Sequence, residues 1–117
     1  MNRLANPVAL SCPSCGGVLS QMSSSPPLRF RCQVGHAYTA ETLAAEQECS
    51  VDEALRVALR IVEERAVLTQ KMADEARRVG LLHSAASYEE TSARSREHVE
   101  TLRDALRKVE SRTASAA

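Results

Sequence analysis

The spacing of three cysteines and one histidine is the feature that most constrains how this chain can fold. Cys12 and Cys15 are separated by two residues and followed by two glycines, and Cys32 and His36 form a second pair further along. Zinc binds four thiolate or imidazole ligands in a tetrahedron, and two cysteines at this spacing can bind one ion from a single tight turn. The pattern predicts one closed, structural zinc site that leaves no coordination position for a catalytic water.

Other uses of these residues stay open. A disulfide network would leave His36 unexplained and would need an oxidising compartment. A redox pair at Cys12 and Cys15 would need a strand before it and a helix after it, and the two following glycines argue against that. Cys49 could replace His36 as the fourth ligand, although it lies outside any knuckle-like turn and is otherwise expected to be a small buried residue. Iron could replace zinc in the same four ligands.

Composition and charge exclude some classes of protein. The chain has 15 basic and 15 acidic residues, and this balance argues against a protein that binds nucleic acids or membrane surfaces through charge alone. No apolar run is long enough to span a membrane, and the N-terminus lacks the pattern of a signal peptide. We therefore expect a cytoplasmic protein, and in that compartment spaced cysteines are more often metal ligands than disulfides.

Residues 1–38 are predicted to form a zinc ribbon around a short β-hairpin. Residues 18–22 have the pattern of a first strand, and in residues 28–32 apolar side chains alternate with arginines, as in a half-buried second strand. Residues 23–27, three serines and two prolines, are expected to be the surface loop between them. Residues 1–11 are expected to be a short lead-in.

Residues 39–117 are predicted to be helical. Thr39 can cap a short helix over about 40–48. Ser50 and Glu53 have the spacing of a capping box, which predicts a new helix over about 51–79, although the two helices could also run on through this point. Gly80 can end that helix in a left-handed conformation, and a third helix is expected over about 84–111. The predicted fold class is thus α+β, mainly α: a zinc ribbon, a short helix and a long antiparallel helical hairpin.

The helix predicted over 51–79 has more apolar surface than one neighbour can cover. Its apolar positions span an arc of about 200° at 100° per residue, and one facing helix covers roughly half of that. Met72 is expected to lie in the core of the hairpin. Another part of the chain, a protein partner or a second copy of the chain is expected to cover the remainder of the arc.

The sequence resembles a known protein family in its first two thirds. The matching segments are Cys12-Pro-Ser-Cys15-Gly-Gly-Val-Leu, the run from Leu28 to Tyr38, and Ala40-Glu-Thr-Leu43-Ala-Ala-Glu-Gln47. They look like a C-terminal extension found on some bacterial chemotaxis protein-glutamate methylesterases. The resemblance implies an accessory module of a bacterial signalling system. The methylesterase domain is absent from this sequence, so no catalytic residue is carried over.

The favoured function is therefore non-enzymatic: a structural-zinc module that acts as a protein-interaction, scaffold or regulatory domain in chemotaxis-like signalling. The alternative is a nucleic-acid-binding ribbon, in which Arg29 and Arg31 on one strand face, with Arg3, contact phosphates. A zinc hydrolase would need an open coordination position and a general base, and the sequence shows neither. The remaining polar candidates are given structural roles. His83 is expected at the tip of the helical hairpin and His98 on the flank of the third helix. Ser92 and Ser95 are expected to let the helices approach closely, with a small polar gap as the alternative.

Overall fold

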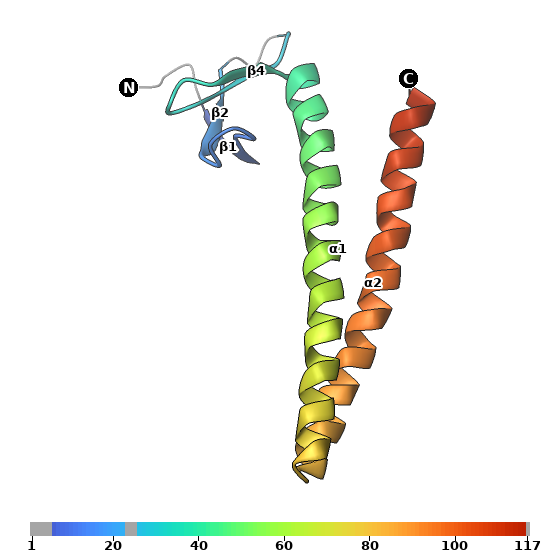
Figure 1. The fold of residues 1–117 in the computed structure, drawn as a ribbon. Coiled ribbons are helices and arrows are strands. Elements are labelled where there is room, and N and C mark those ends of the chain that lie inside the picture. The colour runs from blue at the N-terminus through green and yellow to red at the C-terminus, as the bar shows by residue number, and fades with distance from the viewer. Residues whose placement is uncertain (1–5, 23–25, 117) are drawn as a thin grey trace. The chain divides into compact units, whose positions relative to one another are not determined.

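The structure, a computed structural model, describes residues 6–22 and 26–116 and divides into two compact units, Met1–Val51 and Asp52–Ala117. The elements follow one another as four strands and two long helices (Figure 1). The α+β, mainly α class is thereby confirmed. The bounds are β1 Asn6–Ser11, β2 Val18–Gln21, β3 Arg29–Cys32, β4 Ala37–Thr39, α1 Ala40–Arg78 and α2 Leu82–Ala116.

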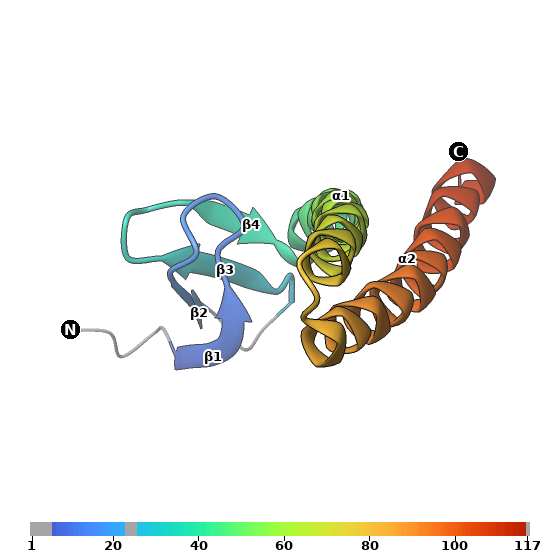
Figure 2. The same cartoon turned by 60° about the horizontal axis from the view of Figure 1, so that its bottom comes forward.

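The four strands form one antiparallel sheet in the order β1-β2-β3-β4 (Figure 2). Leu19 of β2 lies opposite Cys32 of β3, and Phe30 of β3 lies opposite Tyr38 of β4. The predicted hairpin of two strands is present as β2 and β3, but two more strands flank it. The expectation that residues 1–11 are only a lead-in was wrong, because Asn6–Ser11 pair with β2 as an edge strand. An edge strand tolerates a proline such as Pro7, which has no N–H to donate.

The core of the N-terminal unit is small. Its buried side chains are Cys12, Leu19, Phe30, Cys32 and Leu43. Two of the predicted metal ligands are thus part of the core itself. Because so few large apolar side chains are buried, the core contributes limited stability of its own, as expected for a module of this size. Of the predicted loop 23–27, residues 23–25 lie outside the described residues.

Helix α1 begins where predicted. The N–H of Thr42 donates to Thr39 Oγ1 (3.1 Å), and the N–H of Thr39 donates to Thr42 Oγ1 (2.9 Å). This reciprocal pair satisfies two backbone donors at the helix start, as a capping box does. One turn later, Leu43 is buried against the sheet core.

The break predicted near Ser50 is absent, and the helices predicted over 40–48 and 51–79 are one continuous helix, α1. A capping box starts a helix only if its first residue leaves the helical conformation. No glycine or proline occurs within α1 to force that change. One serine in a helix interior costs only a fraction of 1 kcal/mol of helix stability relative to alanine, or about 0.5 kcal/mol. The helix therefore continues through Ser50.

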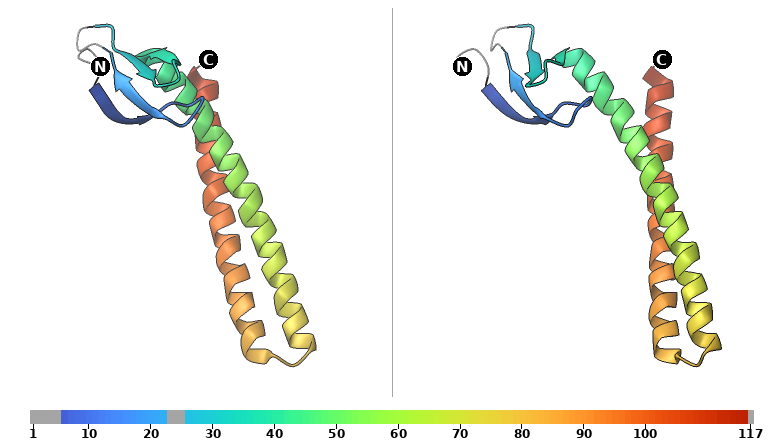
Figure 3. Two further views of the ribbon diagram at one scale, coloured as in Figure 1. Left: turned by 90° about the vertical axis from the view of Figure 1, so that its left-hand side faces the viewer. Right: turned by 60° about the vertical axis from the view of Figure 1, so that its left-hand side comes forward.

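A short turn over residues 79–81 joins α1 and α2 into a hairpin. Figure 3 shows the turn and the two helices that it joins. Gly80 has a φ of +86°, and its N–H donates to the carbonyl of Arg77 while that of Leu81 donates to the carbonyl of Ala76. These two bonds form a Schellman motif, which ends α1 as the glycine predicted. The predicted third helix is α2, which starts two residues earlier and ends five residues later than expected.

Small side chains fill the contact between the two helices. The buried residues are Ala66, Thr69, Ala73 and Ala76 on α1 and Ala85, Ser92, Ser95, Val99 and Leu106 on α2. The Ser92 hydroxyl donates to the carbonyl of Ala66 across the hairpin (2.9 Å). Ser92 and Ser95 thus lie where close approach was expected. Met72, however, is not in the core: 37% of its surface is exposed, because a narrow contact between small residues does not reach it.

Candidate metal centre

The first half of the site is the turn that follows β1. The N–H of Cys12 donates to the carbonyl of Gly17, and the N–H of Gly16 donates to the carbonyl of Cys12, both at 2.7 Å. Gly16 has a φ of +78°, a conformation that a side chain would strain. The turn therefore folds tightly enough to bring Cys12 and Cys15 to one side, as the Cys-Pro-Ser-Cys-Gly-Gly segment predicted.

The second half of the site is the turn between β3 and β4. The N–H of Cys32 donates to the carbonyl of His36 (3.0 Å), and the N–H of Gly35 donates to the carbonyl of Cys32 (3.1 Å). Gly35 has a φ of +115°. The N–H of His36 also points at the Cys32 sulfur, at 3.3 Å. This turn places Sγ of Cys32 and Nδ1 of His36 3.3 Å apart.

The sheet brings the two turns together. One ligand atom from each of Cys12, Cys15, Cys32 and His36 lies within 4.8 Å of all the others. The two contacts between the turns are 3.7 Å, from Cys15 Sγ to Cys32 Sγ, and 3.6 Å, from Cys12 Sγ to His36 Nδ1. All four predicted ligands are therefore in one cluster, and the histidine faces it through Nδ1.

These distances can be compared with those of a tetrahedral site. Bonds of about 2.3 Å to sulfur and 2.0–2.1 Å to nitrogen place two sulfurs about 3.8 Å apart and a sulfur and a nitrogen about 3.5 Å apart. The observed separations of 3.7, 3.6 and 3.3 Å lie close to these values. The donor set is three soft sulfurs and one imidazole nitrogen, which suits zinc or iron. The four residues can thus hold a metal ion.

Backbone amides favour the thiolate form of two ligands. Burial raises the pKa of the Cys32 thiol, but the amides of His36 and Gly35 outweigh burial and bring this pKa down to about 7. Burial also raises the pKa of Cys12, and hydrogen bonds from Tyr38 and nearby amides lower it overall. The Gly17 amide lowers the pKa of Cys15, but burial and the thiols of Cys12 and Cys32 together have the larger, opposite effect. The pKa of Cys15 is therefore raised overall. A metal binds the deprotonated thiols, so these amides prepare the ligands for it.

Tyr38 and Ser14 support the cluster from outside, and neither was expected there. The hydroxyl of Tyr38 lies 3.5 Å from Cys12 Sγ and 2.7 Å from Ser14 Oγ. The contact with Cys12 raises the pKa of Tyr38, which keeps its hydroxyl protonated and able to donate. Groups of this kind orient metal ligands. The register of β4 against β3 places Tyr38 here, and β4 was not predicted from the sequence.

The other candidate residues lie outside the cluster. Cys49 is exposed on α1, so the expectation that it is buried was wrong, and it is not among the clustered ligands. Within residues 6–22 and 26–116, no second group of three or more metal-binding side chains is found. Arg29 and Arg31 are exposed on one face of β3, and Phe30 and Cys32 are buried on the other face. Arg3 lies outside the described residues. His83, next to the hairpin turn at the start of α2, and His98 on α2 are both exposed, as expected for the tip and the flank of the hairpin.

Comparison with known proteins identifies no relative. No family model matches the sequence, and neither a search of curated proteins nor a search of solved structures gives a match. In the part of the chain that the structure describes, no helix combines the length and the apolar character needed to cross a membrane.

Proposed function

We propose that this chain is a non-enzymatic module in which one structural zinc ion organises the N-terminal sheet, and in which the helical hairpin contacts other protein surfaces as a scaffold or regulatory element. The observation that supports it best is the closed donor set. Three sulfurs and one nitrogen lie at the separations of a complete tetrahedron. When bound, zinc would supply folding energy to this unit.

The surroundings of the cluster favour a structural over a catalytic role. Cys12 and Cys32 are buried at 2% and 4% exposure and are part of the core. A catalytic zinc site keeps one position for water or substrate and has a general base beside it. Here four protein ligands fill the tetrahedron, and the hydroxyl that contacts the cluster is that of Tyr38, whose ordinary pKa is far too high for a base at neutral pH.

Cobalt substitution tests the closed site directly. Co²⁺ in a tetrahedral thiolate site has strong visible absorption bands that shift when an added anion enters the coordination sphere. We expect the Co²⁺-loaded full chain to show these bands and to keep them unchanged when azide or cyanide is added. His36→Gly is the matched control, since it opens one position and should respond to the anion. A response of the unmodified chain to the anion would contradict a closed site and favour the hydrolase.

The interaction role rests on the exposed apolar side chains of α1 and, for its setting in chemotaxis-like signalling, on the resemblance of the sequence alone. Leu68, on the outer side of α1, is 58% exposed. A photoreactive amino acid in place of Leu68 should cross-link the full chain to protein in living cells, whereas the same group in place of Leu82 at the hairpin turn should do so far less. Equal or absent cross-linking at both positions would contradict the role of this face.

A second candidate function is nucleic-acid binding through β3. Arg29 and Arg31 are exposed on one face of the strand and, with Met22 and Thr39, line an open pocket. If these arginines contact phosphates, binding of the full chain to a random DNA or RNA oligonucleotide should weaken steeply with salt. It should also be lost in the double variant Arg29→Gln/Arg31→Gln. No measurable binding at low salt would remove this candidate.

A further inference from the structure

Five exposed apolar residues form a stripe along α1 on the side away from the small-residue contact with α2. The outer stripe consists of Val57, Ile61, Leu68, Met72 and Val79. Their exposed fractions lie between 37% and 61%. At 100° per residue the five positions fall within about 60° of one another, whereas the buried Ala66 and Ala73 project to the opposite side.

The outer stripe is regular. Val57, Leu68 and Val79 are eleven residues apart, and Ile61 and Met72 repeat the same interval. Eleven residues are close to three turns of an α-helix, so the stripe runs nearly parallel to the helix axis for ~33 Å. A long, straight apolar stripe of this kind is suited to packing against another helix. Soluble monomers rarely leave so extended an apolar surface uncovered.

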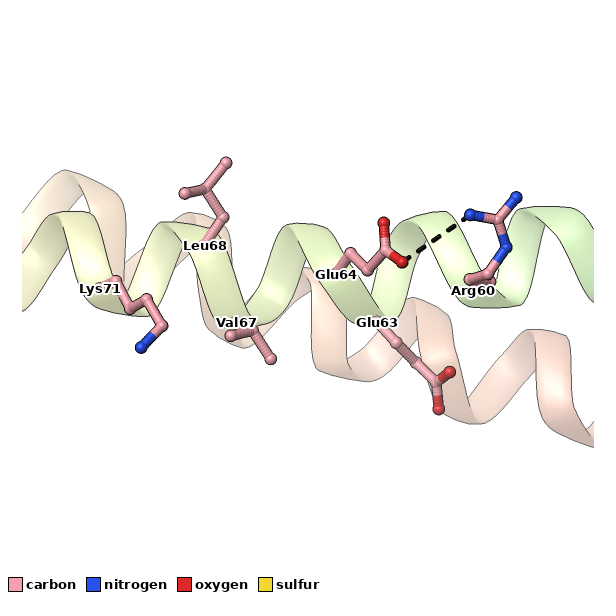
Figure 4. A pocket seen from close by; sticks show the side chains of 6 residues that line it. All are labelled: Arg60, Glu63, Glu64, Val67, Leu68 and Lys71. Atoms are coloured by element: carbon pink, nitrogen blue, oxygen red, sulfur yellow. Dashed lines mark ion pairs between the residues drawn. The ribbon is translucent and has the colours of Figure 1, made fainter.

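The charges beside the outer stripe indicate which helix fits. Between Val57 and Val79 one flank carries Arg60, Glu64, Lys71 and Glu75, in that order along the chain, followed by Arg78, which forms an ion pair with Glu75 of the same helix. These four charges are antisymmetric about a point between Val67 and Leu68. Arg60 and Glu75 lie equally far from that point and have opposite charges, and the same holds for Glu64 and Lys71. Figure 4 shows this part of α1, including the Arg60–Glu64 ion pair and Leu68.

We propose that the outer stripe is the interface of a homodimer in which α1 packs antiparallel against α1 of a second copy, about a two-fold axis near Leu68. In that arrangement Arg60 of each copy faces Glu75 of the other, and Glu64 faces Lys71. These four positions are then matched by opposite charges, and Arg78 keeps its ion pair with Glu75 of its own helix. The same surface serves both copies, as a two-fold interface requires. This inference deepens the proposed function by naming the protein partner of the hairpin.

Antiparallel packing is favoured over parallel packing by the two flanks. Antiparallel helices bring the same flank of both copies together, whereas parallel helices bring opposite flanks together. The opposite flank carries Ala54, Ala58 and Arg65, with no acidic residue to face Arg60 or Lys71. Interhelical charge pairs of this kind set the orientation of packed helices. The dimer would be a four-helix arrangement in which α1 contributes the centre and α2 lies outside.

The mass of the full chain in solution tests the dimer. We expect sedimentation equilibrium to give twice the chain mass over a micromolar to millimolar range. Leu68→Lys should give a monomer, because it places two ammonium groups near the two-fold axis. Leu82→Lys is the matched control: Leu82 is 65% exposed but lies at the hairpin turn outside the outer stripe, so the dimer should persist. A monomeric unmodified chain would overturn the proposal. The outer stripe would then be covered by the N-terminal unit of the same chain or by a different protein.

Charge reversal tests the antiparallel register. Arg60→Glu and Glu75→Arg should each raise the dissociation constant of the dimer roughly tenfold, since each change creates two like-charge contacts. The double variant Arg60→Glu/Glu75→Arg should recover most of the lost affinity. A double variant no tighter than either single one would overturn the antiparallel arrangement. Zinc content measured on the same samples reports separately on the structural-metal function, so failure of the dimer and failure of the metal site are distinguishable.

Discussion

Replacing Cys32 with serine should unfold the N-terminal unit and leave the helical hairpin folded. Cys32 is 4% exposed, and its sulfur lies 3.7 Å from Cys15 Sγ and 3.3 Å from His36 Nδ1. A serine hydroxyl does not ionise at neutral pH and is a poor ligand for zinc. Cys32→Ser therefore removes one of four ligands from the centre of the cluster and leaves a buried polar group in its place.

The magnitude follows from comparing the metal with the apolar core. A structural zinc site supplies an apparent ~10–16 kcal/mol of folding free energy at neutral pH. The large apolar side chains buried in the unit, apart from the ligands, are Leu19, Phe30 and Leu43. At roughly 1.5–3 kcal/mol each they contribute about 5–9 kcal/mol. Because the metal contributes more than the apolar core, losing it should leave the unit unfolded at 25 °C.

Hydrogen exchange of the full chain, followed by mass spectrometry, resolves the two units. In Cys32→Ser, amides of β2, β3 and β4 should exchange at the rate of an unfolded chain, whereas amides of α1 beyond Asp52 and of α2 should stay protected by their packing in the hairpin. Cys49→Ser is the matched control, because Cys49 is an exposed cysteine outside the cluster. It should retain both its zinc and its protection.

One result would refute this reasoning. If Cys32→Ser contains no metal and its strands are still protected, the apolar core suffices to fold the unit. The cluster would then not be structural in the sense proposed. Simultaneous loss of protection in the hairpin would instead show that the two units fold cooperatively, which the independent core of each unit argues against.

Three further predictions concern individual hydrogen bonds and packing. Tyr38→Phe removes the hydroxyl that contacts Cys12 and should lower zinc affinity about 10–100-fold in competition with a chromophoric chelator; unchanged affinity would refute the supporting role. Ser92→Leu should destabilise the hairpin by about 1–3 kcal/mol in urea, because Ser92 is 0% exposed between the helices, whereas the exposed Ser87→Leu should have little effect. The hydrogen bonds from Arg77 lower the pKa of Glu89, so this pair stabilises the fold above the ordinary carboxyl pKa of 4.5 and loses that effect as pH falls through the lowered value. Glu89→Gln should therefore reduce the acid-dependent part of the loss in thermal stability, and an unchanged pH profile would contradict this.

The sequence was most informative where covalent spacing alone fixes the geometry. Two residues between Cys12 and Cys15 and three between Cys32 and His36 leave each pair only a few turn conformations, and glycines supply the positive φ that these turns need. The cluster of four could therefore be predicted without knowing the fold. The helical hairpin could be predicted from the spacing of apolar residues and from the position of Gly80, because both are local features of the sequence.

The missed features depend on tertiary context. β4 is only three residues long and pairs with β3 through a register that no local pattern encodes, so the contact of Tyr38 with Cys12 was not foreseen. Ser50 has the local pattern of a helix start, but α1 packs as one unbroken helix. Met72 was placed in the interior because it is apolar, and the narrow contact between small side chains leaves it exposed. Cys49 was also expected to be buried and is exposed on α1.

X-ray absorption at the zinc edge of the natively purified full chain tests the central claim most directly. The account predicts one zinc per chain bound by three sulfurs at about 2.3 Å and one nitrogen at about 2.0–2.1 Å. Iron in place of zinc, four sulfur ligands, an oxygen ligand in the first coordination sphere, or a native protein that contains no metal would contradict it.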